Sequence, residues 1–355
     1  MTMSRTAAPS GSLPAEWECT DPVVIMALPH RDTDWAYMLD DAVRCFRDMI
    51  KAIARYARVV VLSPVPDEAR ALLTGIDGPV NIIETPTNDT WTRDYGVITL
   101  RMPDGSNRCL DFTFNAWGMK FAAGLDNRVN RTLDADGFFS HPLSCCKDMV
   151  LEGGSIESDG NGTLLVTSQC LLEPNRNPWM SAEEIDRQLR ERLGMRKVLW
   201  LDHGFLMGDD TDSHIDTLAR FAPGRKIVCV ECDDPSDPHY EELQLMRQQL
   251  ATFTDADGQP YEIITLPMAD AVYDPDDGIR LPATYANYLA LPGVVILPSY
   301  DSPEKDAAAA ATLRDAYSCE VVAVDCRALL RQHGSLHCST MQIPLSATRL
   351  SDYSK

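Results

Sequence analysis

The sequence predicts an α/β protein. Three observations support this fold class: short apolar runs rich in β-branched residues, intervening segments with helical spacing, and a strand–turn–helix order that recurs along the chain. With 355 residues, 45% of them hydrophobic, the chain can bury a large core without disulfides or metal.

The strand-like runs are residues 23–28, 59–63, 226–230, 294–298 and 321–325. Helical patterns cover residues 40–56, 181–193 and 302–317. Ser181 followed by Glu184 is typical of a helix N-terminus, and residues 155–172 form a predicted hairpin that turns at 159–162.

Three segments, which start at residues 59, 227 and 294, repeat the order of buried strand, Pro/Asp/Ser turn and helix. This order suggests one structural unit used more than once. Because no long linker interrupts the chain, we expect a single domain over residues 1–355, with residues 1–18 as a flexible N-terminal segment.

The chain is strongly acidic, with 32 basic and 53 acidic residues and a net charge of -21. Such a field repels phosphate backbones and anionic membranes, so neither nucleic acid nor a membrane is an expected partner. Small cations would be attracted to an acidic cleft. A homodimer is compatible with the sequence but is not determined by it.

Eleven cysteines at irregular spacing are typical of a reduced protein, so we expect a cytoplasmic location. Cys229 and Cys232 have the CxxC spacing. No second pair of ligands follows them, which favours buried core residues over a zinc site.

Residues 334–340 hold a lone cysteine, Cys338, in a loop that begins with glycine. A nucleophilic thiolate needs a cationic or basic neighbour. The adjacent His337 would face away from Cys338 in an extended segment, so a distant histidine is the better candidate for this role.

His214 lies in the acidic stretch 208–218. If that stretch is extended, His214 and Asp216 project to the same face, where a carboxylate would orient the ring and raise its pKa. A calcium loop is a weaker alternative, because the glycine and the terminal glutamate of an EF-hand are absent. A solvated acidic turn explains the stretch equally well when it is taken alone.

Two further stretches place acids at strand ends, where scaffolds present functional groups. One is residues 88–96, which contain Trp91 and Asp94, although a surface pair of Arg93 with Asp94 would be the simpler explanation of that motif. The other places Glu152 directly before the predicted hairpin.

Taken together and in order, six motifs resemble those of the agmatine deiminase family, which is related to bacterial-type peptidyl-arginine deiminases. They span most of the chain and lie at residues 91–96, 114–118, 151–155, 175–178, 212–216 and 334–344.

The resemblance implies a five-bladed α/β-propeller of pseudosymmetric ββαβ-type units around a central active site. It also implies that Cys338 is the nucleophile, His214 the general acid/base, and Asp94, Glu152 and Asp216 the carboxylates around a guanidinium. The implied reaction converts agmatine to N-carbamoylputrescine and ammonia through a covalent thiouronium, in putrescine biosynthesis, with no metal and no organic cofactor.

The far end of the substrate is the less determined part. Asp34, Trp35, Trp91 and Trp117 are candidate wall residues of the substrate site. A peptidyl-arginine or free-arginine deiminase, an amidinotransferase of the same superfamily, and a non-catalytic cation-binding scaffold remain the alternatives.

Overall fold

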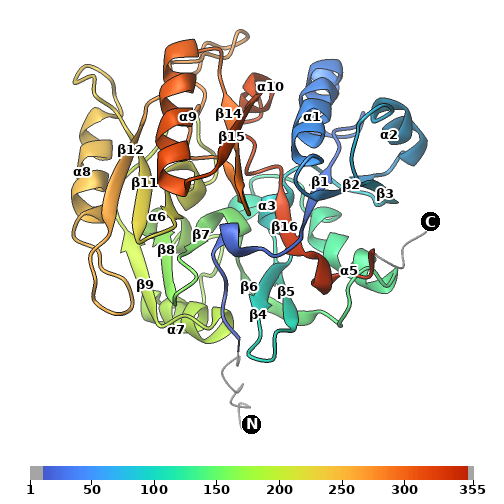
Figure 1. Ribbon diagram of the computed structural model, residues 1–355, viewed down its shortest axis with the longest axis horizontal. Helices are drawn as coiled ribbons and strands as arrows, with labels where there is room; N and C mark the ends of the chain where they lie inside the picture. The colour runs from blue at the N-terminus through green and yellow to red at the C-terminus, as the bar shows by residue number, and fades with distance from the viewer. Residues whose placement is uncertain (1–10, 351–355) are drawn as a thin grey trace.

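The computed structural model describes residues 11–350, and in it five small sheets form a ring around a common centre (Figure 1). Four sheets have three strands and one has four. In each three-stranded sheet the first two strands pair antiparallel, and the third joins the second in parallel after a helical crossover. The predicted five-bladed α/β propeller of ββαβ units is therefore confirmed.

The strands, blade by blade and in sheet order, are β16 (Met341–Pro344), β1 (Pro22–Ala27), β2 (Arg58–Ser63) and β3 (Val80–Glu84); β4 (Ile98–Arg101), β5 (Asn107–Thr113) and β6 (Ser144–Val150); β7 (Ile156–Ser158), β8 (Thr163–Thr167) and β9 (Lys197–Leu201); β10 (Ala219–Ala222), β11 (Lys226–Glu231) and β12 (Glu262–Pro267); β13 (Leu289–Leu291), β14 (Val294–Ser299) and β15 (Glu320–Asp325).

The α-helices are α1 (Leu39–Ile53), α2 (Pro66–Leu72), α3 (Thr92–Tyr95), α4 (Ala116–Met119), α5 (Val129–Ala135), α6 (Ser168–Leu171), α7 (Ala182–Leu193), α8 (Tyr240–Leu250), α9 (Pro303–Tyr317) and α10 (Arg327–Leu330). The 3₁₀ helices are η1 (Glu16–Glu18), η2 (Asp34–Met38), η3 (Asp126–Arg128), η4 (Gly153–Ser155), η5 (Ile215–Thr217) and η6 (Leu345–Ala347).

The structure confirms most of the strands and helices that local sequence patterns predicted. The strand-like runs became β1, β2, β11, β14 and β15, and the helical patterns became α1, α7 and α9. At the start of α7, the Ser181 side chain accepts a hydrogen bond from the Glu184 amide, and Gly194 ends the helix at φ 67°. The predicted hairpin exists as β7 and β8, but it ends in α6 instead of continuing to residue 172.

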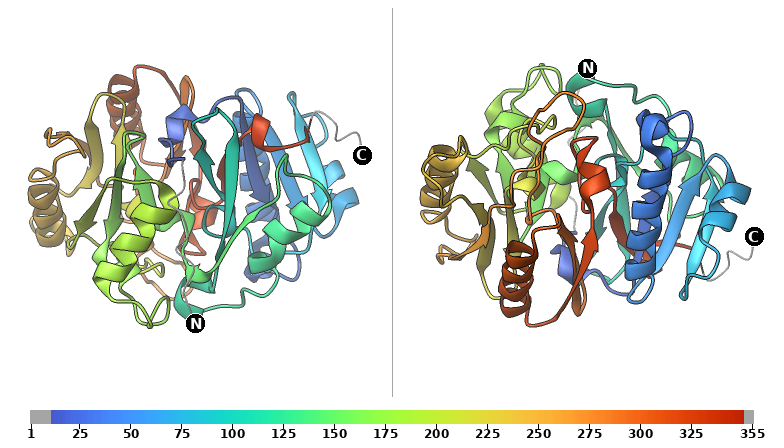
Figure 2. Two further views of the ribbon diagram at one scale, coloured as in Figure 1. Left: turned by 90° about the horizontal axis from the view of Figure 1, so that it is seen from below. Right: turned by 90° about the horizontal axis from the view of Figure 1, so that it is seen from above.

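The crossover helices α1, α7, α8 and α9 lie on the outside of the ring in both views of Figure 2. They cover one side of strands whose other side faces the centre, which is why all six residues of β1 are buried. Cys229 and Cys232 belong to a hydrophobic cluster, in agreement with their expected core role. Among residues 11–350, no helix has both the length and the apolar character of a membrane span.

The first blade is closed by the two ends of the described chain, because β16 pairs antiparallel with β1 and Val23 lies opposite Ile343. This pairing brings the loop around Cys338, which directly precedes β16, to the centre of the ring (Figure 1).

The expectation of a flexible segment over residues 1–18 is wrong for residues 11–18. Ser12 forms a β-bridge with Arg101, and the side chain of Glu16 is only 6% exposed. The segment is held because Glu16 enters the polar centre of the ring. Residues 1–10 lie outside the described residues.

Candidate active site

The predicted site residues come from short elements that follow or precede the blade strands at the centre of the ring. Asp94 is in α3, Glu152 caps η4, Asp216 is in η5, and Cys338 lies shortly before β16. Helix α3 contacts η4, and η4 in turn contacts η5. Residues far apart in the sequence therefore meet at one place.

Gly154 marks the point of convergence. A Cβ atom added to it would lie 2.6 Å from His214 Nδ1, 2.8 Å from Asp94 Oδ1 and 3.0 Å from Asp216 Oδ2. No side chain fits there, so glycine is required for these three groups to approach one another. The Gly154 amide also donates a hydrogen bond to Asp94 Oδ1 at 3.0 Å.

His214 is fully buried between two carboxylates. Its Nδ1 lies 3.6 Å from Asp94 Oδ1, and its Nε2 lies 3.6 Å from Glu152 Oε2. Burial alone would lower the pKa of His214, but the negative groups around it, Asp94 foremost, raise the pKa well above its usual value. Neither ring nitrogen has a hydrogen-bond partner within residues 11–350.

The sequence analysis considered an extended stretch around His214, but the structure shows that this stretch is not a strand. His214 is the N-cap of η5, and Asp216 lies inside that 3₁₀ helix. The two side chains nevertheless reach the same spot beside Gly154. The predicted juxtaposition is correct, but a tight helical turn produces it, not the alternation of a strand.

Glu152 is anchored by Arg176, a residue to which the sequence analysis gave no role. Arg176 Nε donates to Glu152 Oε1 at 3.0 Å and to Oε2 at 2.8 Å, and both side chains are fully buried. Burial would raise the pKa of Glu152, but Arg176 and His214 lower it below its ordinary value. The only indication of a role for Arg176 in the sequence was its place within one of the six motifs.

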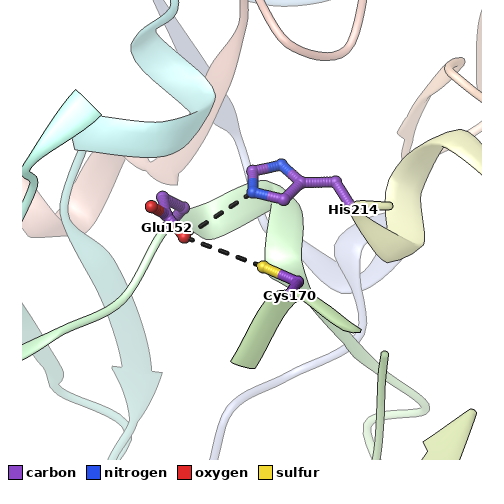
Figure 3. Close-up of side chains that lie close together, drawn as sticks. All are labelled: Glu152, Cys170 and His214. Atoms are coloured by element: carbon purple, nitrogen blue, oxygen red, sulfur yellow. Dashed lines mark hydrogen bonds and ion pairs between the residues drawn. The ribbon is translucent and has the colours of Figure 1, made fainter. Parts of the chain in front are cut away.

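A second thiol, Cys170 of α6, lies beside Glu152 and His214 (Figure 3). Its sulfur is 3.9 Å from Glu152 Oε2, and ligand atoms of Glu152, Cys170 and His214 lie within 4.8 Å of one another. These residue types can bind zinc. The guanidinium of Arg176, already bonded to both Glu152 oxygens, would repel a metal cation, so the set fits a metal poorly.

Asp94 is held in one orientation by Trp117, whose Nε1 donates to Asp94 Oδ2 at 3.0 Å. Burial raises the pKa of Asp94 to about 6, with Asp216 and Glu152 adding to the rise and His214 and Trp117 opposing it. Asp94 therefore ionises within the physiological range of pH.

Cys338 lines a small, narrow cavity of about 20 Å³. Asn287 Oδ1 lies 3.4 Å from its sulfur. Burial raises the pKa of this thiol well above its usual value, and the nearby Asp216 and Asp94 raise it further. Asp94 lines this cavity and also faces His214, so it connects the thiol with the imidazole.

Three of the four candidate wall residues, Asp34, Trp91 and Trp117, line the Cys338 cavity. Trp35 does not, which corrects that expectation. Its ring is fully buried at a centroid distance of 5.7 Å from that of Trp91, and its Nε1 donates to Asp89 Oδ1 at 3.0 Å.

The sequence analysis missed several other lining residues, namely Asp89, Phe121, Asp210, Thr211, Gln332, His333 and Gly334. Burial raises the pKa of both Asp89 and Asp210 to about 6, with Asp34 and Asp209 respectively as additional causes. Asp89 and Asp210 fall in the two acidic stretches already noted, but nothing in the sequence distinguished them from their acidic neighbours.

His337 faces away from Cys338, as the sequence predicted. Its Nδ1 lies 2.7 Å from Asp216 Oδ2 and its Nε2 lies 2.6 Å from Glu16 Oε2. Whereas Cys338 lines the narrow cavity, His337 lines a different and larger one of about 310 Å³.

Solved structures with known names share this architecture. A cysteine-to-serine variant of the agmatine deiminase of C. jejuni, with substrate bound, superposes with a TM-score of 0.88 at 35% identity, over 97% of this chain and 98% of that one. A protein from Porphyromonas gingivalis, provisionally named an arginine deiminase, gives a TM-score of 0.88 at 48% identity, over 96% and 99% of the two chains.

The sequence comparisons agree with the structural ones. The agmatine deiminase of Pseudomonas aeruginosa strain LESB58 is 34% identical over 358 residues, which cover 94% of this chain and 95% of that protein. Residues 12–344 match the family of Porphyromonas-type peptidyl-arginine deiminases. With residues of three of the six motifs lining one cavity, we conclude that this chain belongs to the Porphyromonas-type peptidyl-arginine deiminase family.

Proposed function

We propose that the protein hydrolyses agmatine to N-carbamoylputrescine and ammonia, with Cys338 as the nucleophile and His214 as the general acid/base. Asp94, Glu152 and Asp216 hold the guanidinium in this proposal. The single observation that carries it is a buried acceptor, the carboxylate oxygen Asp216 Oδ1, that lacks a hydrogen-bond partner among residues 11–350.

Such atoms are costly to bury unless something else satisfies them. A planar cation with several N–H donors would do so. The guanidinium group has five donors in a fixed plane and no acceptor, and it pairs with carboxylates in bidentate fashion. The acidic lining of the site and the net charge of -21 favour such a cation over any anionic ligand.

The raised pKa of Cys338 fits the same ligand. Burial, Asp216 and Asp94 all disfavour the thiolate in the empty site. A bound guanidinium would neutralise the two carboxylates and place positive charge beside the sulfur, so the thiolate would form in the presence of the substrate that it attacks.

In the first half of the reaction, the Cys338 thiolate forms a bond to the guanidinium carbon. The imidazolium of His214 gives its proton to the departing nitrogen, the carbon–nitrogen bond breaks, and ammonia leaves a covalent S-alkylthiouronium on Cys338.

In the second half, neutral His214 takes a proton from water, and the hydroxide adds to the same carbon. The carbon–sulfur bond then breaks and returns the thiolate. The product loses its extra proton to the released ammonia, so one water is consumed and a ureido compound and one ammonium ion are formed.

The cavity lining supports an amine at the far end of the substrate. Asp34, Asp89 and Asp210 line it, and no arginine is among the described residues of the lining. An α-carboxylate would normally be met by an arginine, whereas an amine is met by acids. Two relatives already described, from C. jejuni and Pseudomonas aeruginosa, are agmatine deiminases.

A peptidyl-arginine or arginine substrate is the second candidate. It is favoured by the family name and by the 48% identity to the provisionally named arginine deiminase of Porphyromonas gingivalis. Peptidyl-arginine has no free α-carboxylate and so needs no arginine to bind one. The lack of an arginine among the described lining residues therefore argues against free arginine but not against peptidyl-arginine.

A substrate panel separates these candidates. Purified protein is incubated with agmatine, free arginine or a blocked arginyl peptide, and both ammonia and the ureido product are measured, the latter by mass spectrometry. Turnover of agmatine with the largest kcat/KM supports the proposal. No ammonia from agmatine refutes it, and turnover of the peptide alone establishes the second candidate.

We propose further that residues 1–355 act as one catalytic domain in the cytoplasm, as a homodimer that has no nucleic-acid or membrane partner. All eleven cysteines are free, which fits a reducing compartment.

A further inference from the structure

The strongest unassigned feature is a buried row of charges behind the carboxylates. Glu16, from the N-terminal segment, meets His337, which lies 321 positions later, at 2.6 Å. His337 in turn meets Asp216 at 2.7 Å. The two side chains that flank the His337 ring are at most 6% exposed, so the row is largely buried.

This geometry specifies the charge on His337. A neutral imidazole has one N–H and one acceptor nitrogen, so it can donate to only one carboxylate. Here each ring nitrogen faces a carboxylate oxygen. Two donors satisfy both carboxylates, and only an imidazolium supplies two.

Glu16 is well fixed for this task. Its Oε1 accepts a hydrogen bond from the Ala290 amide at 2.7 Å, and its carboxylate lies 3.2 Å from both Arg93 and Arg220. Burial would raise the pKa of Glu16, but His337, Arg220 and Arg93 together lower it well below its ordinary value. Glu16 is thus a permanent buried anion.

At the other end of the row, the two oxygens of Asp216 differ. Oδ2 is occupied by His337, whereas Oδ1 has no hydrogen-bond partner among the described residues. With Oδ2 held by His337, Oδ1 is the Asp216 oxygen that remains to accept a donor from a ligand.

We propose that Glu16 is a positioning residue that holds His337 as an imidazolium, and that His337 thereby orients the Asp216 carboxylate with Oδ1 toward the substrate guanidinium. The inference rests on the proposed function, because it assigns Asp216 Oδ1 to that cation. It gives the N-terminal segment, expected to be flexible, a part in completing the site.

The variant E16Q tests the proposal, since glutamine keeps the shape of the side chain and removes its charge. We expect KM for agmatine to rise while kcat changes less. The reason is that Asp216 would bind the guanidinium in both the ground state and the transition state. The loss in kcat/KM should be about 10- to 100-fold, the usual effect of removing a partner that orients a ligand group.

The matched control is E18Q. Glu18 belongs to the same short helix, but its side chain is 33% exposed and pairs with Arg101 near the surface. E18Q should keep wild-type kinetics. Equal kinetics of E16Q and E18Q would overturn the proposal.

A rescue experiment separates charge from mere packing. Glu16 and His337 both line the cavity of about 310 Å³, whose lining includes the exposed Gly105, so a small carboxylate can enter. In E16A, formate should restore kcat/KM in a saturable manner, whereas chloride should not. A loss of activity in E16A that neither salt reverses, together with a fully active E16Q, would assign Glu16 a purely structural role.

A spectroscopic test does not depend on turnover. In ¹⁵N-histidine-labelled wild-type protein without ligand, His337 should show both ring nitrogens protonated, with its resonances assigned by their absence in H337Q. A neutral His337 would overturn the inference. If wild-type protein fails to turn over agmatine while His337 is doubly protonated, the proposed function fails but the charge assignment stands.

Discussion

Trp117 Nε1 donates a hydrogen bond to Asp94 Oδ2 at 3.0 Å, from a backbone in the left-handed region at φ 54°. A non-glycine residue in this region is strained, and such strain is retained where the surrounding structure uses it. Here it brings an indole to a carboxylate whose pKa burial raises to about 6.

The first prediction concerns this hydrogen bond. W117F removes a donor to the ionised form of Asp94, so the pKa of Asp94 should rise further above about 6. Because Asp94 must be ionised to hold the guanidinium, kcat/KM of the wild type should increase as pH rises through 6. In W117F this rise should occur at higher pH, and kcat/KM at pH 7 should fall about tenfold or more.

The measurement is kcat/KM for agmatine from pH 5 to 9 in both proteins. W179F is the control, because Trp179 is 64% exposed and should leave the profile unchanged. An acid limb at the same pH in W117F and wild type would contradict the assignment of this limb to Asp94.

The second prediction concerns the two buried histidines. H214Q should abolish turnover, because neither the departing nitrogen nor the attacking water would have a proton partner. H337Q should retain residual activity, since His337 acts only through Asp216. Single-turnover assays of both variants, with H203Q as a partly exposed control, test this order of effects. An inactive H337Q beside an active H214Q would reverse the two roles.

The third prediction concerns the state of the Cys338 thiol. Its pKa is raised well above the usual value by burial, Asp216 and Asp94, so the free site should contain very little thiolate at pH 7. Neutral iodoacetamide should therefore label Cys338 slowly, and faster as pH rises. The cationic 2-chloroacetamidine should react faster, because its charge offsets the two carboxylates.

Mass spectrometry of Cys338 peptides after timed labelling gives both rates. Cys145, which is exposed, serves as the internal reference for ordinary thiol reactivity. Equal rates for the neutral and the cationic reagent at Cys338, after normalisation to Cys145, would argue against substrate-assisted ionisation.

The fourth prediction concerns Gly154. G154A adds a Cβ within 3.0 Å of three side chains at the site, so it should displace them and lower kcat/KM by about 100-fold or more. G124A adds the same atom in open space, with nothing within 4 Å, and should be neutral. Comparison of kinetics and melting temperature for the two variants tests whether the close approach at Gly154 matters. A fully active G154A would mean that the three groups are not held there during turnover.

The fifth prediction concerns the amine end of the substrate. Asp210 lines the cavity and is largely buried, which raises its pKa to about 6. A bound amine would favour its charged form, so D210N should raise KM for agmatine about tenfold and change kcat little. D257N, at an exposed ion pair with Arg196, is the control. An unchanged KM in D210N would place the amine elsewhere.

The local elements were largely predictable. The apolar runs that became β1, β2, β11, β14 and β15, and the Ser181 cap of α7, depend on side-chain patterns within a few residues. The number of blades did not follow from these patterns. It came from the ordered motifs, because only three of the strand–turn–helix units were visible in the sequence.

The contacts between blades were not predictable in the same way. Trp35 and Trp91 looked alike as wall residues, yet only Trp91 lines the cavity, whereas the Trp35 ring is fully buried and its Nε1 donates to Asp89. Arg176 lay in a motif without any sign that it would bond to Glu152. Such pairings depend on how the blades pack. The residues next to one partner in the sequence do not indicate which residue the other partner is.

The sequence by itself determined the kinds of chemistry available to this protein: a thiol in a glycine-led loop, a histidine among acids, and a net charge suited to a cation. Only the tertiary structure decided that Asp216 keeps one oxygen without a hydrogen-bond partner among residues 11–350, and that Glu16 meets His337 from far away in the sequence. The physical reason is that residue identity fixes what a side chain can donate or accept. Closure of the ring by β1 and β16 fixes which groups are buried together and which are left without a partner.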